Sequence, residues 1–195
     1  MLSTKIDNNI QEKATLLLGT TGMLSAAAAH AVARSRKAVL VSRHASDFSF
    51  NNDVLDYKLT PIDVSYEDES AFLDALLVHA PFDLALTWMH PQAEILRAAL
   101  DGMIAKGGTL VEVMGSRSIL LGEDGEASIA ERRAQALALQ TDITYAQLIL
   151  GFVIEGATSR WLTHEEISAA AIAQMEDPVA RRIAGTLEPW DRRPA

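Results

Sequence analysis

Short apolar runs alternate along the chain with stretches of helical periodicity. Six runs rich in Val, Leu, Ile and Ala have the length of buried strands and span residues 14–18, 37–43, 58–64, 82–88, 109–114 and 143–150, with a polar loop between the second and the third. The other stretches predict helices, which span residues 26–35, 67–80, 91–105 and 127–139. Since strands joined through helices pair in parallel, we predict an α/β fold: one doubly wound parallel sheet with helices on both faces.

Residues typical of helix ends refine these boundaries. Pro91 suits the first turn of its helix, and Gly107 with Gly108 is typical of a stop after that helix. Farther along, Thr163 and Glu166 have the spacing of a capping box. A further helix is therefore expected to begin at Thr163.

The length of 195 residues is that of one domain with a sizeable core, and no segment has the composition of a linker. We therefore expect a single domain over residues 1–195, with flexible tails at 1–13 and 189–195. In a doubly wound sheet, ligands bind beyond the carboxyl ends of the strands. Candidate functional residues are accordingly sought where the apolar runs end.

Composition excludes several kinds of function. A formal net charge of −9 with only short basic clusters argues against a nucleic-acid partner, because binding many phosphates needs a clustered basic face. The chain has no cysteine, which excludes disulfides, thiolate metal sites and a cysteine nucleophile. Residues 1–13 are polar, and no apolar run reaches the roughly 20 residues of a membrane span. We expect a cytoplasmic protein with a small-molecule substrate, no metal and no membrane partner.

The segment Gly19-Thr20-Thr21-Gly22-Met23-Leu24-Ser25 links the first apolar run to an alanine-rich helix. A glycine turn at this place lets the backbone approach a pyrophosphate and directs helix N–H groups at it. Only Gly19 and Gly22 match the dinucleotide fingerprint Gly-x-Gly-x-x-Gly, since Ser25 stands at a position where glycine is expected. The spacing alone is equally typical of an ordinary turn, so the surroundings of the pair decide its meaning.

Gly-Thr-Thr-Gly-Met-Leu resembles the glycine turn of short-chain dehydrogenase/reductases, especially their atypical and extended branches. The resemblance extends from about Ala14 to Val153 and implies a Rossmann sheet with strand order 3-2-1-4-5-6 and a nicotinamide dinucleotide cofactor. Gly151-Phe152-Val153 is similar to the family segment that packs on the nicotinamide. The resemblance assigns to the cofactor the residues Gly19, Thr20, Thr21, Gly22, Met23, Leu24, Ser42, Arg43, His44, Asp63, Val64, Thr87, Trp88, Met89, Gly115, Gly151, Phe152 and Val153.

Arg43 discriminates between the two nicotinamide cofactors. An acid at this position is typical of NAD-dependent enzymes, whereas a guanidinium pairs with the 2′-phosphate of NADP. NADP (NADPH) is therefore favoured over NAD, with Ser42 and His44 as further phosphate contacts, and a solvated arginine is the alternative. By the resemblance, Asp63 accepts a hydrogen bond from adenine and Val64 packs beside it, although aspartate near a helix start also serves as a cap.

The chain lacks the catalytic Tyr-x-x-x-Lys of the family, because no lysine follows Lys106. Three residues are candidates for catalysis. His90 ends a segment that replaces the family's Asn-Asn-Ala-Gly, and a histidine side chain, with a reference pKa of about 6.5, can donate or accept a proton, with a structural role as the alternative. Ser116 comes after the fifth run and either polarises a substrate or caps the next element. Tyr145 lies within the sixth run, where a core tyrosine is the competing interpretation.

Two functional hypotheses remain. The first is an NADP-dependent oxidoreductase that reduces a small carbonyl or imine; an iminium arrives already protonated, which lessens the need for a Tyr-Lys acid. The second is a non-catalytic NADP-binding sensor or regulator, which the missing motif favours. A non-redox isomerase or lyase is a third alternative. Arg160 and Trp161 are further candidates for the substrate pocket, and the resemblance also implies a homodimer.

Overall fold

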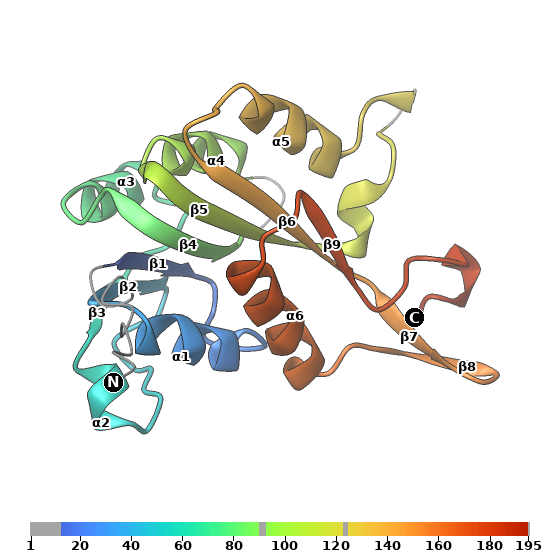
Figure 1. Cartoon of the computed structure of the whole chain (residues 1–195), viewed down its shortest axis with the longest axis horizontal. Helices are drawn as coiled ribbons and strands as arrows, with labels where there is room; N and C mark the ends of the chain where they lie inside the picture. Colours follow the sequence, from blue (N-terminus) through green and yellow to red (C-terminus); the bar gives the residue numbers. More distant parts are fainter. Residues whose placement is uncertain (1–12, 90–92, 123–124, 195) are drawn as a thin grey trace, which may run out of the picture.

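Seven parallel strands form one sheet in the order β3-β2-β1-β4-β5-β6-β9 (Figure 1). The computed structural model describes residues 13–89, 93–122 and 125–194. The strands of the sheet are β1 (Ala14–Leu18), β2 (Lys37–Ser42), β3 (Leu59–Asp63), β4 (Phe82–Trp88), β5 (Ile104–Gly115), β6 (Thr144–Leu150) and β9 (Arg181–Ala184). The predicted α/β class and the order of the first six strands are confirmed, and β9 adds a seventh strand beside β6.

Helices cover both faces of the sheet (Figure 1). On one face lie α1 (Ser25–Ala33) and α6 (His164–Glu176), which contact each other. On the other face lie α3 (Glu69–Leu77), α4 (Glu94–Asp101) and α5 (Ile129–Ala138). No helix in the described ranges combines the length and the apolar character needed to cross a bilayer.

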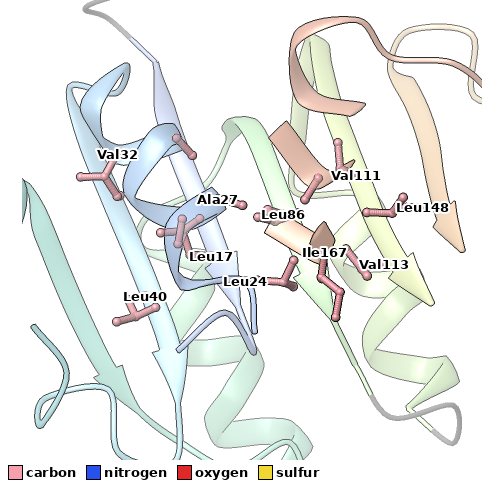
Figure 2. Close-up of a cluster of buried hydrophobic side chains, with 14 of the residues drawn as sticks. Leu17, Leu24, Ala27, Val32, Leu40, Leu86, Val111, Val113, Leu148 and Ile167 are labelled. Carbon is pink, nitrogen blue, oxygen red and sulfur yellow. The ribbon is translucent and has the colours of Figure 1, made fainter. Parts of the chain in front are cut away.

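Apolar strand residues point alternately to the two faces and fill a core on each side. Leu17, Leu40 and Leu86 are fully buried on the face of α1 and α6, where Figure 2 shows them packed with Leu24 and Ile167. Burying one such side chain contributes about 1.5–3 kcal/mol. These contacts hold the ends of the central strands, and the turns that come after them, in fixed positions.

The stop predicted at Gly107 and Gly108 is wrong, because both glycines lie inside β5. Phe82 pairs with Ile104 but Leu84 pairs with Thr109, so the ladder between β4 and β5 contains a bulge. Gly107 has a φ of +79°, and a Cβ on Gly108 would lie 2.8 Å from the Ala105 carbonyl oxygen. The glycines therefore permit a kink in a long strand, not the end of a helix.

The capping box at Thr163 and Glu166 is confirmed at the start of α6. Several elements were not predicted. A short helix, α2 (Asp53–Asp56), lies in the expected polar loop, and β7 (Phe152–Glu155) with β8 (Thr158–Trp161) forms an antiparallel hairpin after β6. Strand β9 was also missed, because a four-residue strand with two arginines carries no apolar pattern.

The chain after β9 packs on the β7–β8 hairpin. Phe152 and Thr186 form an antiparallel bridge, and Arg192 donates a hydrogen bond of 2.7 Å to the Gly156 carbonyl. Trp190–Arg192 form a short 3₁₀ helix, η4. A Cβ on Gly151 would lie 2.1 Å from the Thr186 carbonyl oxygen, so glycine is needed where this segment crosses the end of β6.

Candidate functional site

The glycine turn between β1 and α1 passes directly beside the end of β4. Gly19 has a φ of +68°, and a Cβ there would lie 2.3 Å from the Trp88 carbonyl oxygen, so only glycine fits without strain. At Gly22, by contrast, a Cβ would have no other atom within 4 Å. The first glycine is required by the fold, whereas the second leaves open space at the start of the helix.

The start of α1 has the properties of an anion site. Leu24, which precedes it, provides no side-chain cap, and the first turn contains no acid. The hydroxyl of Ser168 on α6 donates to the Met23 carbonyl at 3.0 Å and accepts from the Ala27 N–H at 3.3 Å, which holds the turn in place. The Thr20 hydroxyl is buried without a partner among the described residues. These features fit the pyrophosphate of a dinucleotide.

A cavity of about 500 Å³, here called the first cavity, lies beyond the ends of β1, β2, β4 and β5. Eight predicted cofactor residues line it: Gly19, Thr21, Ser42, Arg43, Val64, Trp88, Met89 and Gly115. Its other lining residues are Leu18, Val41, Tyr66, Phe72, Arg97, Met114, Arg117, Ser118 and Ile129. The carboxyl ends of the strands thus bring together residues that are far apart in the sequence.

Asp63 fixes the loop after β2. Its carboxylate accepts hydrogen bonds from the backbone N–H of Ser46, at 2.8 Å, and from the Ser46 hydroxyl. These two bonds hold the pKa of Asp63 below its usual range. Ser42 accepts a hydrogen bond of 3.3 Å from the His44 N–H within the same loop. Asp63 and His44 therefore shape the loop that carries Arg43, although neither lines the first cavity.

A second cavity, of about 330 Å³, lies on the other side of Trp88, between the ends of β4, β5 and β6 and the start of α6. Its lining residues are Trp88, Gly115, Ser116, Arg117, Leu150, Gly151, Trp161, Leu162, Ile167 and Arg193. Ser116 is buried at the start of the 3₁₀ turn η2 (Ser116–Ile119). Because Trp88, Gly115 and Arg117 also line the first cavity, the two cavities adjoin along one edge of the sheet.

Three arginines at the carboxyl edge of the sheet differ from most other arginines in the partners of their side chains. Within the part of the chain that the structure describes, Arg43, Arg117 and Arg193 make no hydrogen bond or ion pair through their side chains, and all three line the cavities. Arg36, which is exposed before β2, is the only other described arginine in this state. Unneutralised guanidinium groups around a cavity favour an anionic ligand.

Several predicted residues lie outside the lining of both cavities. Thr20, Leu24, Thr87 and Phe152 are buried in the interior. The lining also omits Gly22, Met23 and Val153. His90 lies outside the described residues. Of the two further pocket candidates, Trp161 lines the second cavity, whereas Arg160 binds Glu155 and Glu166 at 2.8 Å.

Tyr145 belongs to a buried polar network instead of the carboxyl edge. It is the second residue of β6, and its hydroxyl donates to Glu112 at 2.6 Å. Burial, together with the charge of Glu112, raises the pKa of Tyr145 above its usual range. Arg97 and Arg133 bind the same carboxylate at 2.6 and 3.0 Å. This environment favours the core interpretation over proton transfer at the opposite end of the sheet.

Sequence patterns alone missed Arg97, Arg117, Tyr66 and Arg193 as lining residues. Arg97 reaches the first cavity from α4 and donates to the Met89 carbonyl at 2.9 Å. Arg117 comes directly after Ser116, so its place after a strand was a usable signal. Arg193 comes from the segment expected to be a flexible tail, and no local pattern links it to β8.

No protein-family model matches the chain, and a search of curated proteins finds no match. Solved structures are similar in fold. A short-chain type dehydrogenase/reductase from Mycobacterium marinum has a TM-score of 0.65 and 13% identity, over 92% of this chain and 96% of its own. Pseudomonas aeruginosa RhlG, in a complex with NADP, has a TM-score of 0.60 and 13% identity, over 90% and 95%.

Bordetella bronchiseptica WbmG, in a complex with NAD, has a TM-score of 0.57 and 13% identity, over 94% of this chain and 74% of its own. At this identity the likeness shows the fold alone. The chain has a Rossmann-like α/β fold, the fold that the resemblance of its glycine turn implies, and the solved structures that share this fold include short-chain dehydrogenase/reductases.

Proposed function

We propose that this protein binds NADPH across the first cavity and reduces a small carbonyl or imine substrate in the second. The observation that carries the proposal is the convergence of the glycine turn, the loop after β2 and the ends of β4 and β5 on one cavity. Solved structures of the same fold contain NADP or NAD, which supports a nicotinamide dinucleotide as cofactor.

Each part of the first cavity suits one part of the cofactor. The turn at Gly19–Gly22 and the uncapped start of α1 suit the pyrophosphate. Arg43, which has no acidic partner among the described residues, suits the 2′-phosphate of NADPH, with Ser42 beside it. Val64 packs on the adenosine. NADPH is preferred over NADH because the uncharged ribose of NADH offers Arg43 no anion.

The nicotinamide end of the cofactor and the substrate bind in the second cavity. A bound nicotinamide supplies the hydride for reduction. Ser116, buried in the lining, donates a hydrogen bond to the substrate oxygen or nitrogen and so polarises the bond that is reduced. Trp88 and Trp161 wall the cavity and keep water from the reacting atoms. His90 stays a candidate proton donor.

The first experiment measures the dissociation constants of NADPH and NADH for the wild type, Arg43→Ala and Arg36→Ala. Wild type is expected to bind NADPH at least about 10-fold more tightly than NADH, since a charge-assisted hydrogen bond contributes about 1.5–3 kcal/mol. Arg43→Ala loses this preference, whereas Arg36→Ala, which removes an exposed arginine away from the cavities, retains it. Equal affinity for both cofactors in the wild type would contradict the assignment of Arg43.

The second experiment monitors NADPH oxidation with a panel of small aldehydes, ketones and cyclic imines. We expect turnover with at least one member and a loss of kcat of about 100-fold in Ser116→Ala, the scale of one removed oxyanion donor. A change in KM alone would show that Ser116 only positions the substrate.

A non-catalytic NADPH sensor is the second candidate. It is favoured because none of the three tyrosines, all among the described residues, lines the second cavity, and no lysine follows Lys106. NADPH binding with no oxidation across the whole panel, in the wild type as in Ser116→Ala, would select this function over the reductase.

A further inference from the structure

The second cavity combines apolar walls with positive charge. Leu150, Leu162 and Ile167 supply aliphatic surface, and Trp88 and Trp161 supply aromatic surface. Its ionisable lining residues are Arg117 and Arg193, with no acid among those that the structure describes. In a chain of net charge −9, two such arginines on one small cavity are not a consequence of overall composition.

Arg193 is held in place by aromatic contacts and has no ion pair among the residues that the structure describes. Its guanidinium carbon lies 5.3 Å from the centre of the Trp161 ring and 5.0 Å from that of Trp190, so two aromatic side chains flank it. The neighbouring Arg192 fastens the segment to the hairpin through hydrogen bonds to the carbonyls of Gly156 and Thr158. Stacking orients the guanidinium while leaving its N–H groups available for a ligand.

Two acids near the hairpin, Glu155 and Glu166, are already bound by another arginine. Arg160 binds Glu155 at 2.8 Å and binds both carboxylate oxygens of Glu166, at 2.8 and 3.0 Å. These bonds lower the pKa of Glu166 to about 2. Glu166 also accepts from the backbone N–H of Thr163 in the capping box. The structure therefore pairs the arginine outside the cavity, whereas Arg193, which lines it, has no anionic partner among the described residues.

We propose that the second cavity selects a substrate with a carboxylate group, which Arg193 binds and Arg117 attracts. This inference rests on the proposed function and gives it a substrate class: small oxo acids with an apolar body. A guanidinium fork matches a carboxylate in geometry and charge. The volume of about 330 Å³ and the mostly apolar lining favour a compact monoanion with a hydrocarbon or aryl group over a doubly charged phosphate ester.

The test measures binding to the NADPH-loaded protein of three oxo acids, benzoylformate, phenylpyruvate and 4-methyl-2-oxopentanoate, each beside its methyl ester. The three tryptophans of the chain line the second cavity or stack on Arg193, so their fluorescence reports occupancy, and calorimetry checks it. At least one acid is expected to bind about 10-fold or more tightly than its ester, the ratio typical of one charge-assisted hydrogen bond.

Three variants locate the effect. Arg193→Ala is expected to abolish the preference for acid over ester, Arg193→Lys to retain part of it, and Arg36→Ala to leave it unchanged. Because Trp161 and Trp190 flank Arg193, circular dichroism and the unfolding midpoint of each variant verify that the fold is intact. NADPH affinity is measured on the same samples and is expected to be unchanged in Arg193→Ala.

The outcomes separate the two proposals. Equal binding of every acid and its ester in the wild type, or an acid preference that survives in Arg193→Ala, overturns the carboxylate site even if NADPH binds. Failure of NADPH to bind the wild type overturns the proposed function. In that case acid selectivity that depends on Arg193, measured without cofactor, still supports the anion site.

Discussion

Charged residues between the sheet and helices α4 and α5 are paired, whereas Arg43, Arg117 and Arg193 at the carboxyl edge have no ion pair among the described residues. In the interior, Glu112 binds Arg97 and Arg133, and Arg133 also binds both carboxylate oxygens of Asp101 at 2.9 Å. At the edge, Arg43, Arg117 and Arg193 line the two cavities. None of these three arginines has an acidic partner among the described residues. Both groups are arginines in the same molecule, so the residue type does not explain the difference.

The difference separates charges that serve the fold from charges that serve a ligand. A buried ion is costly unless it is paired and hydrogen-bonded, so the interior network must be complete before any ligand arrives. A guanidinium at a solvent-filled cavity is already hydrated and needs no partner to be stable. Substitutions in the two regions should therefore affect different measurements.

The largest expected effect is that of Glu112→Ala on stability. The change leaves the buried Arg97 and the adjacent Arg133 without their shared carboxylate, and breaking such a pair costs about 3–5 kcal/mol. Urea unfolding measures the loss. Glu94→Ala is the matched control, because its pair with Arg132 is exposed and is worth at most about 1 kcal/mol. Equal losses for the two variants would show that the network is not essential.

Gly19→Ala and Gly22→Ala test, within the glycine turn, the distinction between residues that stabilise the fold and residues that bind a ligand. Alanine at Gly19 adopts a positive φ and meets the Trp88 carbonyl, so we expect a loss of about 2–4 kcal/mol in unfolding free energy. Gly22→Ala meets open space and should change stability by less than about 0.5 kcal/mol, yet weaken NADPH binding at least about 10-fold. A Gly22→Ala variant with unchanged NADPH affinity would place the pyrophosphate elsewhere.

Tyr145→Phe removes one neutral member of the interior network. The loss of its hydrogen bond to Glu112 should cost about 1.5 kcal/mol, while Glu112 keeps both arginines. Tyr57→Phe, at an exposed position, should have no measurable effect. If Tyr145→Phe instead abolishes turnover at unchanged stability, Tyr145 acts in catalysis and the distinction between the two regions fails.

The smallest expected effect is that of the double variant Arg43→Ala/Arg117→Ala on stability. Neither guanidinium has a partner in the described part of the chain, so the unfolding free energy should change by less than about 0.5 kcal/mol. NADPH affinity should fall by more than in Arg43→Ala alone. A loss of stability comparable to that of Glu112→Ala would show that the edge arginines serve the fold.

The predicted elements that were confirmed carry strong local signals. Buried strands such as Ala14–Leu18 are continuous apolar runs, and the capping box at Thr163 has a fixed spacing. Strand β9 and the β7–β8 hairpin were missed because they form against neighbours: β9 pairs with the edge of β6, and Thr186 pairs with Phe152. The prediction at Gly107 and Gly108 was wrong because a helix stop and a strand bulge use the same residue.

The part of the candidate site that comes directly after strands was predictable from the sequence, because it too depends on local patterns. Strand-end residues such as Gly19, Ser42, Arg43 and Ser116 were found because the strand pattern places them at the carboxyl edge. Arg193 was not found, because it reaches the second cavity only through the return of the chain across the end of β6 and its stacking between two tryptophans.

By itself, the sequence determined the α/β class and the position of the glycine turn, since these depend on local periodicity, and the resemblance of that turn to a known family implied the order of six strands. Only the tertiary structure decided which charged residues are neutralised. Arg133 and Arg193 look alike in the sequence, but one lies between two buried carboxylates and the other between two aromatic rings. Pairing of charges depends on distances across the fold, which no local pattern specifies.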